Sequence, residues 1–244
     1  MEQERIPKVI HYCWFGRKNM PELTKKCIES WKKFLPDYKL ILWNEDNFDI
    51  SINPFMKQAY DSHKFAFVSD FLRLYVLYKY GGIYMDTDVE VIKNLDPFLT
   101  KPAFSGFENI NFIPTGIMAS EKNHPWVKVL LDYYEDKFFI NDDGSYNNRP
   151  NTEIITELSK QLGLKLDNTY QVLNGGIHIY PKDYFCPKNL YGGIDLTQNT
   201  YTIHYFAGSW LSPRKRVILY FKKHFFIPLV GEKNYWKLRN MIKK

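Results

Sequence analysis

The sequence predicts an α/β fold in which a mainly parallel sheet lies between helices. Three observations lead to this prediction: short apolar segments alternate with amphipathic ones through the first third of the chain, a long apolar helix is followed by a glycine pair and a strand, and hydrophobic residues make up 45% of the 244 residues. Alternating strands and helices are typical of a parallel sheet between helices. A chain of this size and apolar content can form a substantial core, so we expect a folded domain.

The first third of the chain supplies the alternation. Pro7 and Gly16 bound its first apolar, aromatic segment. The predicted elements are a strand at 8–15, a helix at 21–34, a strand at 39–43 and, after a loop at 44–54, a short helix at 54–63. Catalytic groups in such sheets gather at the carboxyl ends of the strands, and Trp14, Asp86 and Asp88 all lie near such ends.

Residues 65–80 predict a buried helix, because they are apolar almost all round. Ser69, Asp70 and Arg73 nevertheless share one narrow stripe of this helix. A buried carboxylate and a buried guanidinium are costly unless they are paired or bind something. The helix is expected to end at the glycine pair 81–82, because glycine readily adopts the left-handed conformation.

A strand is predicted directly after this glycine pair, over residues 83–91. Its alternation places Tyr84, Asp86, Asp88 and Glu90 on one face. The two aspartates would then point the same way, about 7 Å apart along the backbone. Left alone, they would repel and raise each other's pKa. A hard divalent cation such as Mg²⁺ or Mn²⁺ removes this repulsion, because carboxylate oxygens are suitable ligands for it.

The later elements are predicted from shorter patterns. Asn174-Gly175-Gly176 is typical of a hairpin turn rather than a phosphate-binding loop, and Thr152 is a candidate helix cap. The predicted elements are strands at 103–108 and 117–120, a helix at 123–138, a loop at 139–151, a helix at 152–162, a hairpin within 171–185 and a strand at 201–205.

Charge divides the chain into a body and a tail. Residues 213–244 hold ten Lys or Arg and one acidic residue (+9), whereas the remainder holds 23 basic and 26 acidic residues (−3). We therefore predict a domain at 1–212 and a basic, aromatic tail at 213–244. The acidic body argues against a nucleic-acid groove, and the tail suits an anionic membrane surface or an oligomer contact.

Three further features set the expected compartment. The charged start has no apolar core of a signal peptide, and no apolar run approaches the roughly 20 residues that a spanning helix needs. Cys13, Cys27 and Cys186 are odd in number and lack metal-ligand spacing, which favours reduced thiols. We expect a cytoplasmic protein, peripheral at the inner face of the cell membrane.

The central stretch carries one long combined pattern, S-D-x-x-R-x-x-x-L-x-x-x-G-G-x-Y-x-D-x-D, over residues 69–88. It resembles the DXD-containing sugar transferases of glycosyltransferase family 32 and, more distantly, the glucosyltransferase domain of large clostridial toxins. Residues 6–16 are similar to the family's first strand, and His204 with Ser209 and Trp210 resembles its late H-x(4)-S-W segment. The middle of the chain, about 100–200, matches only loosely.

The resemblance implies a GT-A type fold (a Rossmann-like mixed sheet flanked by helices), a nucleotide-diphosphate sugar donor, Mn²⁺ or Mg²⁺, and retention of anomeric configuration. Asp88 would bind the metal directly, with Asp86 beside it or acting through water and ribose. The site residues that it implies are Asp86, Asp88 and His204 for the metal, Trp14 for stacking on the nucleobase, Tyr84 near the nucleotide, Ser209 and Trp210 for phosphate oxygens, and Asp70 and Arg73 for sugar hydroxyls.

Structural alternatives stay open for several of these residues. Asp70 and Arg73 could form a plain buried ion pair, Trp14 could be a core side chain, and His204 could be a core histidine. His11 is interpreted as structural. A DXD-dependent phosphatase is a weaker alternative, because such enzymes place Thr or Val where this chain has Glu90.

The function expected from the sequence is a metal-dependent, retaining transfer of a hexose. The donor would be a nucleotide sugar, UDP being favoured over GDP by the resemblance, and the acceptor a glycan or lipid-linked glycan in surface polysaccharide synthesis, such as capsule assembly. The alternative of another class is a catalytically silent sugar- or nucleotide-binding protein of the same fold. Intact aspartates, arginine and histidine speak against lost catalysis.

Overall fold

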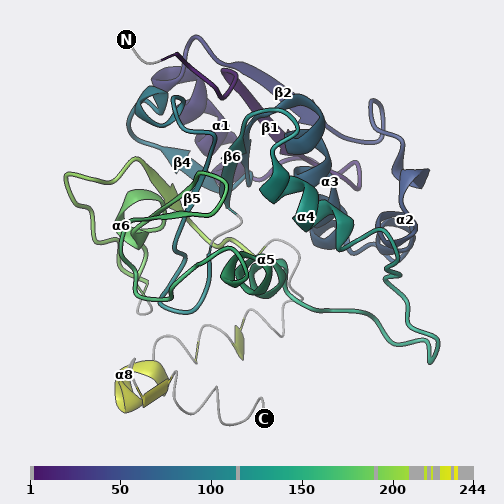
Figure 1. The fold of residues 1–244 in the computed structure, drawn as a ribbon. Helices are drawn as coiled ribbons and strands as arrows, with labels where there is room; N and C mark the ends of the chain where they lie inside the picture. Colours follow the sequence, from purple (N-terminus) through teal and green to yellow (C-terminus); the bar gives the residue numbers. More distant parts are fainter. Residues whose placement is uncertain are drawn as a thin grey trace.

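The structure, a computed structural model, contains a seven-stranded mixed sheet with helices on both faces and a two-stranded sheet beside it (Figure 1). It describes residues 3–113, 116–189 and 192–208 and, in the C-terminal segment, 217–218, 221, 226–231 and 234–235. The predicted α/β fold, with the mixed sheet flanked by helices that the GT-A resemblance implied, is confirmed.

The large sheet combines parallel and antiparallel pairs. In order across the sheet, its strands are β2 (Lys39–Trp43), β1 (Val9–Cys13), β3 (Gly82–Met85), β6 (Ile117–Ser120), β5 (Ala103–Gly106), β8 (Ile177–Tyr180) and β7 (Gln171–Leu173). The β1–β2, β1–β3 and β5–β8 pairs are parallel, and the other three are antiparallel. The sheet is therefore less parallel than the sequence suggested, because β6 runs against both of its neighbours.

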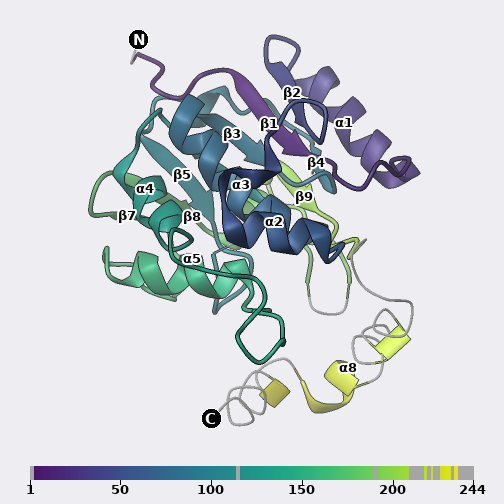
Figure 2. The same cartoon turned by 90° about the vertical axis from the view of Figure 1, so that its right-hand side faces the viewer.

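Helices cover both faces of this sheet. The helices are α1 (Glu22–Phe34), α2 (Pro54–Asp61), α3 (Phe65–Tyr80), α4 (Pro125–Asp132), α5 (Asn151–Lys160), α6 (Lys182–Phe185) and α8 (Ile227–Val230), with 3-10 turns η1 (Ile50–Ile52) and η2 (Asp96–Phe98). Helices α2 to α5 pack on one face against Tyr84 and Met118, and Figure 2 shows them in front of the sheet. Helices α1 and α6 pack on the other face, against Ile83 and Met85.

Helix α3 has the predicted bounds and is largely buried. Eight of its residues are buried, among them the charged Asp70 and Arg73. It ends at Gly81, whose φ is +69° and whose added Cβ would lie 2.8 Å from the backbone nitrogen of Lys122. The glycine is thus required both by the turn conformation and by the close approach of another backbone segment.

The predicted strand over 83–91 is wrong as a single element. It is two strands, because β3 stays in the large sheet whereas β4 (Val89–Val91) pairs antiparallel with β9 (Thr202–His204). A tight turn separates them, and the N–H of Val89 donates to the carbonyl of Asp86 (3.1 Å). The alternation of apolar and polar residues continues through this turn, since Val89 and Val91 pack in the same core as Ile83 and Met85.

Several predicted boundaries also differ from the structure. Helix α4 ends at Asp132 and not near Phe138, and Thr152 does not cap α5, because the helix already begins at Asn151 after Pro150. The hairpin at residues 174–176 is confirmed as the β7–β8 connection, with φ of +92° and +77° at its two glycines. The division at residue 212 falls within 209–216, outside the described residues, and stays a prediction.

Candidate functional site

The two motif aspartates lie in the turn that leaves β3. In the parallel pair of β1 and β3, His11 lies opposite Tyr84. Cys13 and Asp86 each follow two residues later, so they leave this strand pair at equivalent positions. The N–H of Asp86 donates to the carbonyl of Gly116 (2.9 Å), which fixes the start of the turn. The aspartates therefore sit at the carboxyl edge of the sheet, where catalytic groups are expected.

Asp86, Asp88 and His204 form a compact group of possible metal ligands. One ligand atom from each lies within 4.8 Å of the others. The β4–β9 pair produces this arrangement, because Val89 lies directly opposite His204. The three residues that the sequence assigned to a metal are thus brought together by a strand pairing that spans more than 100 residues.

His204 is held closely on one side and lacks a hydrogen bond on the other. Its Nε2 lies 3.2 Å from Oδ1 of Asp88, whereas its buried Nδ1 has no partner of ordinary hydrogen-bond geometry among the described residues, although the Cys186 thiol lies near enough to raise the pKa of the ring. The ring also packs on Gly116, where an added Cβ would lie 2.7 Å from Nδ1. Two carboxylates and an imidazole within reach of one another are a suitable donor set for Mn²⁺ or Mg²⁺, and the nitrogen favours Mn²⁺ over Ca²⁺.

The protonation of these groups follows from their pairing. Burial alone would raise the pKa of Asp88, but His204 and the N–H of Ala207, which donates to Oδ2 (2.7 Å), lower that pKa to about 2. Burial would lower the pKa of His204, but Asp88 raises it well above the usual value. A bound cation would have to displace the proton of His204, so its affinity should fall at low pH.

Arg73 lies behind the turn and links it to α3. Its guanidinium is 3.1 Å from Asp70 and 3.3 Å from Asp86, and it stacks 4.7 Å above the ring of Tyr84. Its Nε–H also donates to the carbonyl of Ser69 (3.1 Å). Burial raises the pKa of Asp70 to about 6 against the opposing effect of Arg73. The charge of Arg73 thus compensates part of the charge of one buried carboxylate, Asp70, and one partly buried carboxylate, Asp86.

The charge of this cluster suits a divalent cation. Asp70, Asp86 and Asp88 are three carboxylates, and Arg73 is the one guanidinium that pairs with them among the described residues. With Arg73 and a protonated His204 as the two cations, this group carries one net negative charge, and loss of the His204 proton on cation binding would leave two. Buried charge of this kind is costly unless it is neutralised, and a bound dication would neutralise it.

Asn151 is a site residue that the sequence analysis missed. It opens α5, it is only 5% exposed, and its Nδ2–H donates to Oδ1 of Asp70 (3.1 Å). Its Oδ1 is buried and has no partner among the described residues. A buried acceptor without a donor usually binds water or a ligand. A single asparagine after a proline has no sequence signal beyond that of a helix start.

Trp14 follows β1 at the same edge of the sheet. Its backbone N–H donates to the carbonyl of Trp43 and its ring Nε1–H to the carbonyl of Lys18 (2.6 Å), and the side chain is half-buried. Its position is therefore compatible with stacking, and it is not a fully buried core residue. Tyr84 is buried, and its hydroxyl lies 3.2 Å from Sγ of Cys13. Ser209 and Trp210 lie outside the described residues.

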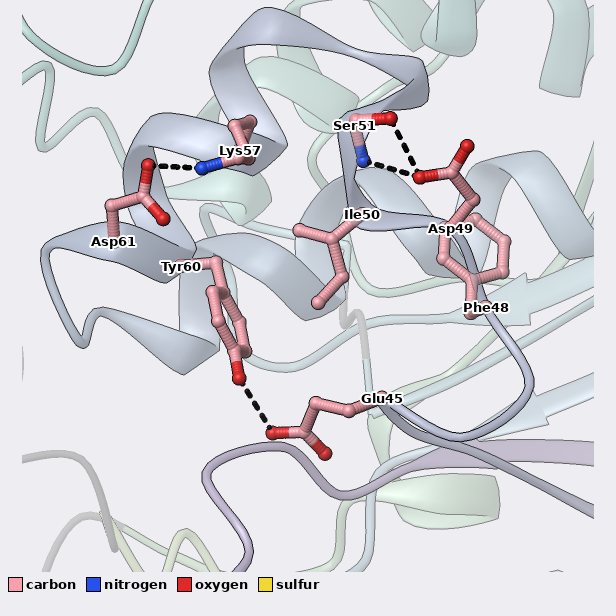
Figure 3. Close-up of a pocket in the computed structure, with 8 residues that line it drawn as sticks. All are labelled: Glu45, Phe48, Asp49, Ile50, Ser51, Lys57, Tyr60 and Asp61. Atoms are coloured by element: carbon pink, nitrogen blue, oxygen red, sulfur yellow. Dashed lines mark hydrogen bonds and ion pairs between the residues drawn. The ribbon is translucent and has the colours of Figure 1, made fainter.

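A separate cavity of about 390 Å³ lies beside the Trp14 loop and does not include the metal-ligand group. Its lining residues are Glu45, Phe48, Asp49, Ile50, Ser51, Lys57, Tyr60 and Asp61 (Figure 3). Oε1 of Glu45 accepts from the hydroxyl of Tyr60 (3.1 Å) and from the N–H of Gly16 (2.6 Å). Glu45 thus ties the loop after Trp14 to α2. The ligand-atom cluster at Asp86 identifies the candidate site more directly than this cavity does.

Comparison with known proteins agrees with the resemblance. Residues 21–105 match the family described as "Glycosyltransferase sugar-binding region containing DXD motif". Inositol phosphoceramide mannosyltransferase 3 of Schizosaccharomyces pombe is 35% identical over 130 residues, which are 50% of this chain and 35% of that relative. Glycosyltransferase L373 of Acanthamoeba polyphaga mimivirus is 28% identical, and the match covers 92% of each chain.

A similar solved structure is that of the PaToxG glycosyltransferase, with a TM-score of 0.49 and 24% identity over 65% of this chain and 70% of that one. The matches to the mannosyltransferases cover about a third of the length of those curated relatives. The resemblance to DXD-containing sugar transferases is therefore confirmed for the region that holds the motif, Asp86-Thr87-Asp88.

Proposed function

Because residues 21–105 match a glycosyltransferase sugar-binding region with a DXD motif, we propose that the protein is a metal-dependent, retaining glycosyltransferase. It moves a hexose from a nucleoside-diphosphate sugar to a glycan or lipid-linked glycan. The observation that carries this proposal is the meeting of Asp86, Asp88 and His204 at the carboxyl edge of the sheet. Their ligand atoms have the identity and spacing that a nucleotide-bound cation requires.

Asp86, Asp88 and His204 are the residues that would hold Mn²⁺ or Mg²⁺. When bound, such an ion acts as a Lewis acid and stabilises the negative charge that develops on the leaving diphosphate. The N–H of Ala207 orients Asp88 by donating to its Oδ2. The partners of a ligand are as much a part of a metal site as the ligand itself.

The donor sugar would lie over α3, beside the hydrogen-bonded pair of Asp70 and Asn151. Arg73 holds Asp70 and Asp86 in fixed positions, and the unpartnered Oδ1 of Asn151 is available to accept from a sugar hydroxyl. Trp14 would stack on the nucleobase, Tyr84 lies beneath Arg73, and Ser209 and Trp210 would hold phosphate oxygens. These roles explain why charged groups are retained on an otherwise apolar helix.

Retention is proposed through front-face attack by the acceptor hydroxyl, assisted by the leaving phosphate. A covalent intermediate would need a carboxylate free to attack the sugar. Asp70 and Asp86 pair with Arg73, and Asp88 pairs with His204, so the carboxylates of the cluster are already engaged. This arrangement favours binding and orientation over nucleophilic attack.

Donor, acceptor and setting are proposed from the resemblance and from the names of the relatives. The resemblance favours a UDP-hexose, whereas the names of several relatives specify mannosyl transfer to inositol phosphoceramide. A lipid-linked acceptor suits both these names and the basic tail. We place the enzyme in surface polysaccharide synthesis, such as capsule assembly, at the cytoplasmic face of the cell membrane.

A thermal-shift panel of UDP- and GDP-sugars, with and without Mn²⁺, tests the proposal. We expect one nucleotide sugar to raise the Tm in the presence of Mn²⁺ and to have little effect with EDTA. Release of nucleoside diphosphate from that donor separates an active enzyme from a silent binding protein. Absence of any metal-dependent shift across the panel would contradict the proposed function.

A further inference from the structure

Exposed large apolar side chains are concentrated in the C-terminal segment. Among the described residues, 17 large apolar side chains are exposed, and five of these are Val217, Ile218, Phe221, Phe226 and Leu229. Only 11 described residues lie after position 208, against 202 before it. Single exposed apolar residues are ordinary, but such a concentration in one segment indicates an interaction surface.

The charge of this segment indicates what the surface contacts. Residues 213–244 hold ten Lys or Arg and one acidic residue. A second copy carrying the same charge would be repelled, whereas an anionic lipid surface would be attracted. In the part of the chain that the structure describes, no helix has the length and apolar character to cross a bilayer. Basic and apolar residues together, in such a segment, are typical of interfacial binding.

Helix α8 has an inward and an outward side. Ile227 is buried with Tyr235, and both pack with Val230 and Phe112. Leu229, two positions after Ile227, projects to the opposite side of the helix and is 85% exposed. In both ribbon views α8 lies away from the sheet, at the lower edge of the molecule (Figures 1 and 2).

The inward side of α8 contacts the loop that leads to the candidate site. Phe112 belongs to the connection between β5 and β6, which continues to Gly116 against the ring of His204. Helix α8 is therefore packed on a loop whose far end borders the metal ligands. A surface that binds the outward side of α8 would fix the orientation of the site relative to that surface.

We propose that the C-terminal segment is an anchor for an anionic lipid bilayer, and that Leu229 enters the bilayer interface while Ile227 and Tyr235 hold the anchor on Phe112. The anchor presents the candidate site to a lipid-linked acceptor. The presentation of the site to a lipid-linked acceptor rests on the proposed function. The binding of lipid does not, since it depends on the C-terminal segment alone. The partner is a membrane surface and not a protein.

Vesicle flotation of the full chain with Leu229→Glu tests this anchor. The probes are vesicles of phosphatidylcholine alone and of phosphatidylcholine mixed with phosphatidylglycerol. We expect binding to the mixed vesicles only, weakened by high salt, and reduced by about fivefold or more in the variant, because a carboxylate replaces an inserted apolar side chain. Leu229 is too exposed for the substitution to disturb folding.

Leu196→Glu is the matched control, because Leu196 is exposed (58%) on the body and the substitution changes the net charge equally. It should bind vesicles as the unchanged protein does. Equal binding by Leu229→Glu, or equal binding to both kinds of vesicle, overturns the proposal. A dimer that dissociates in Leu229→Glu, without vesicle binding, would also overturn it and assign the surface to a second copy. Metal-dependent donor binding is measured on the same samples, so failure of the anchor and failure of the transferase function are separate results.

Discussion

Two buried polar clusters lie along α3, and they differ in how completely their hydrogen-bonding groups are used. Near its C-terminal end, His11 accepts from Nε1–H of Trp43 at Nδ1 (3.1 Å) and donates from Nε2 to the carbonyl of Gly81 (2.9 Å). Nearer the N-terminal end, Asp70, Arg73 and Asp86 join Asn151, whose Oδ1 has no partner among the described residues.

The difference separates a structural cluster from a candidate ligand site. His11 uses both ring nitrogens and is neutral, so nothing further needs to bind there. The Arg73 cluster instead combines excess negative charge with an unsatisfied acceptor, Oδ1 of Asn151. His11, Arg73 and Asn151 are all at most 5% exposed, so burial alone does not identify the functional cluster. The two clusters are distinguished by whether every buried polar group has a hydrogen-bond partner.

Replacing Arg73 with Met is expected to have the largest effect on stability. The substitution leaves the buried Asp70 and the partly buried Asp86 without their countercharge, which should cost about 3–5 kcal/mol in the free energy of unfolding. The loss should shrink as the pH falls, because protonation removes the uncompensated charge. Urea unfolding at several pH values measures both effects.

Arg5→Met is the matched control for this prediction. Arg5 also pairs with a carboxylate, Glu121 (2.9 Å), but it is exposed, so its removal should cost less than about 1 kcal/mol. Similar losses of unfolding free energy in the two variants would show that Arg73 contributes no more to stability than the arginine of an ordinary surface ion pair.

The His11 cluster is expected to have a smaller, pH-dependent effect on the free energy of unfolding. Burial lowers the pKa of His11 from 6.5 to about 4, so between these values the unfolded chain binds a proton that the folded protein does not. The stability that His11 contributes is thus complete above pH 6.5 and is lost as the pH falls toward 4, by about 3 kcal/mol in total. Unfolding free energies from pH 7 to 4 measure this loss.

His11→Gln isolates the contribution of His11, because other histidines titrate equally in both proteins. The unchanged protein should show the steeper dependence of stability on pH, by about 1.4 kcal/mol per pH unit between the two pKa values. Parallel pH profiles would mean that His11 accepts a proton in the folded state, and the contrast between the clusters would disappear.

The sequence predicted the helical and sheet elements near the site well. The exact bounds of α3 follow from an apolar run closed by a glycine, and those of β2 and β6 from short apolar segments. The break between β3 and β4 could not be predicted, because the alternation continues through the turn and only the distant partner β9 draws β4 out of the sheet.

The site was predictable where a long motif marked it and not elsewhere. Asp86, Asp88 and His204 were grouped by resemblance, and the structure places them together. Asn151 was missed because its role depends on α5 lying against Asp70, 81 positions earlier in the chain. Such a contact between distant segments has no local signature.

Whether Asp88 binds a divalent cation can be measured by following Mn²⁺ binding with electron paramagnetic resonance. Asp46→Asn, which removes an exposed carboxylate after β2, serves as the control. We expect the unchanged protein and the control to bind one Mn²⁺, and Asp88→Asn to weaken this binding by about 100-fold or more, since even indirect partners of metal ligands contribute about 10- to 100-fold. Equal Mn²⁺ affinity in Asp88→Asn and the unchanged protein would contradict this expectation.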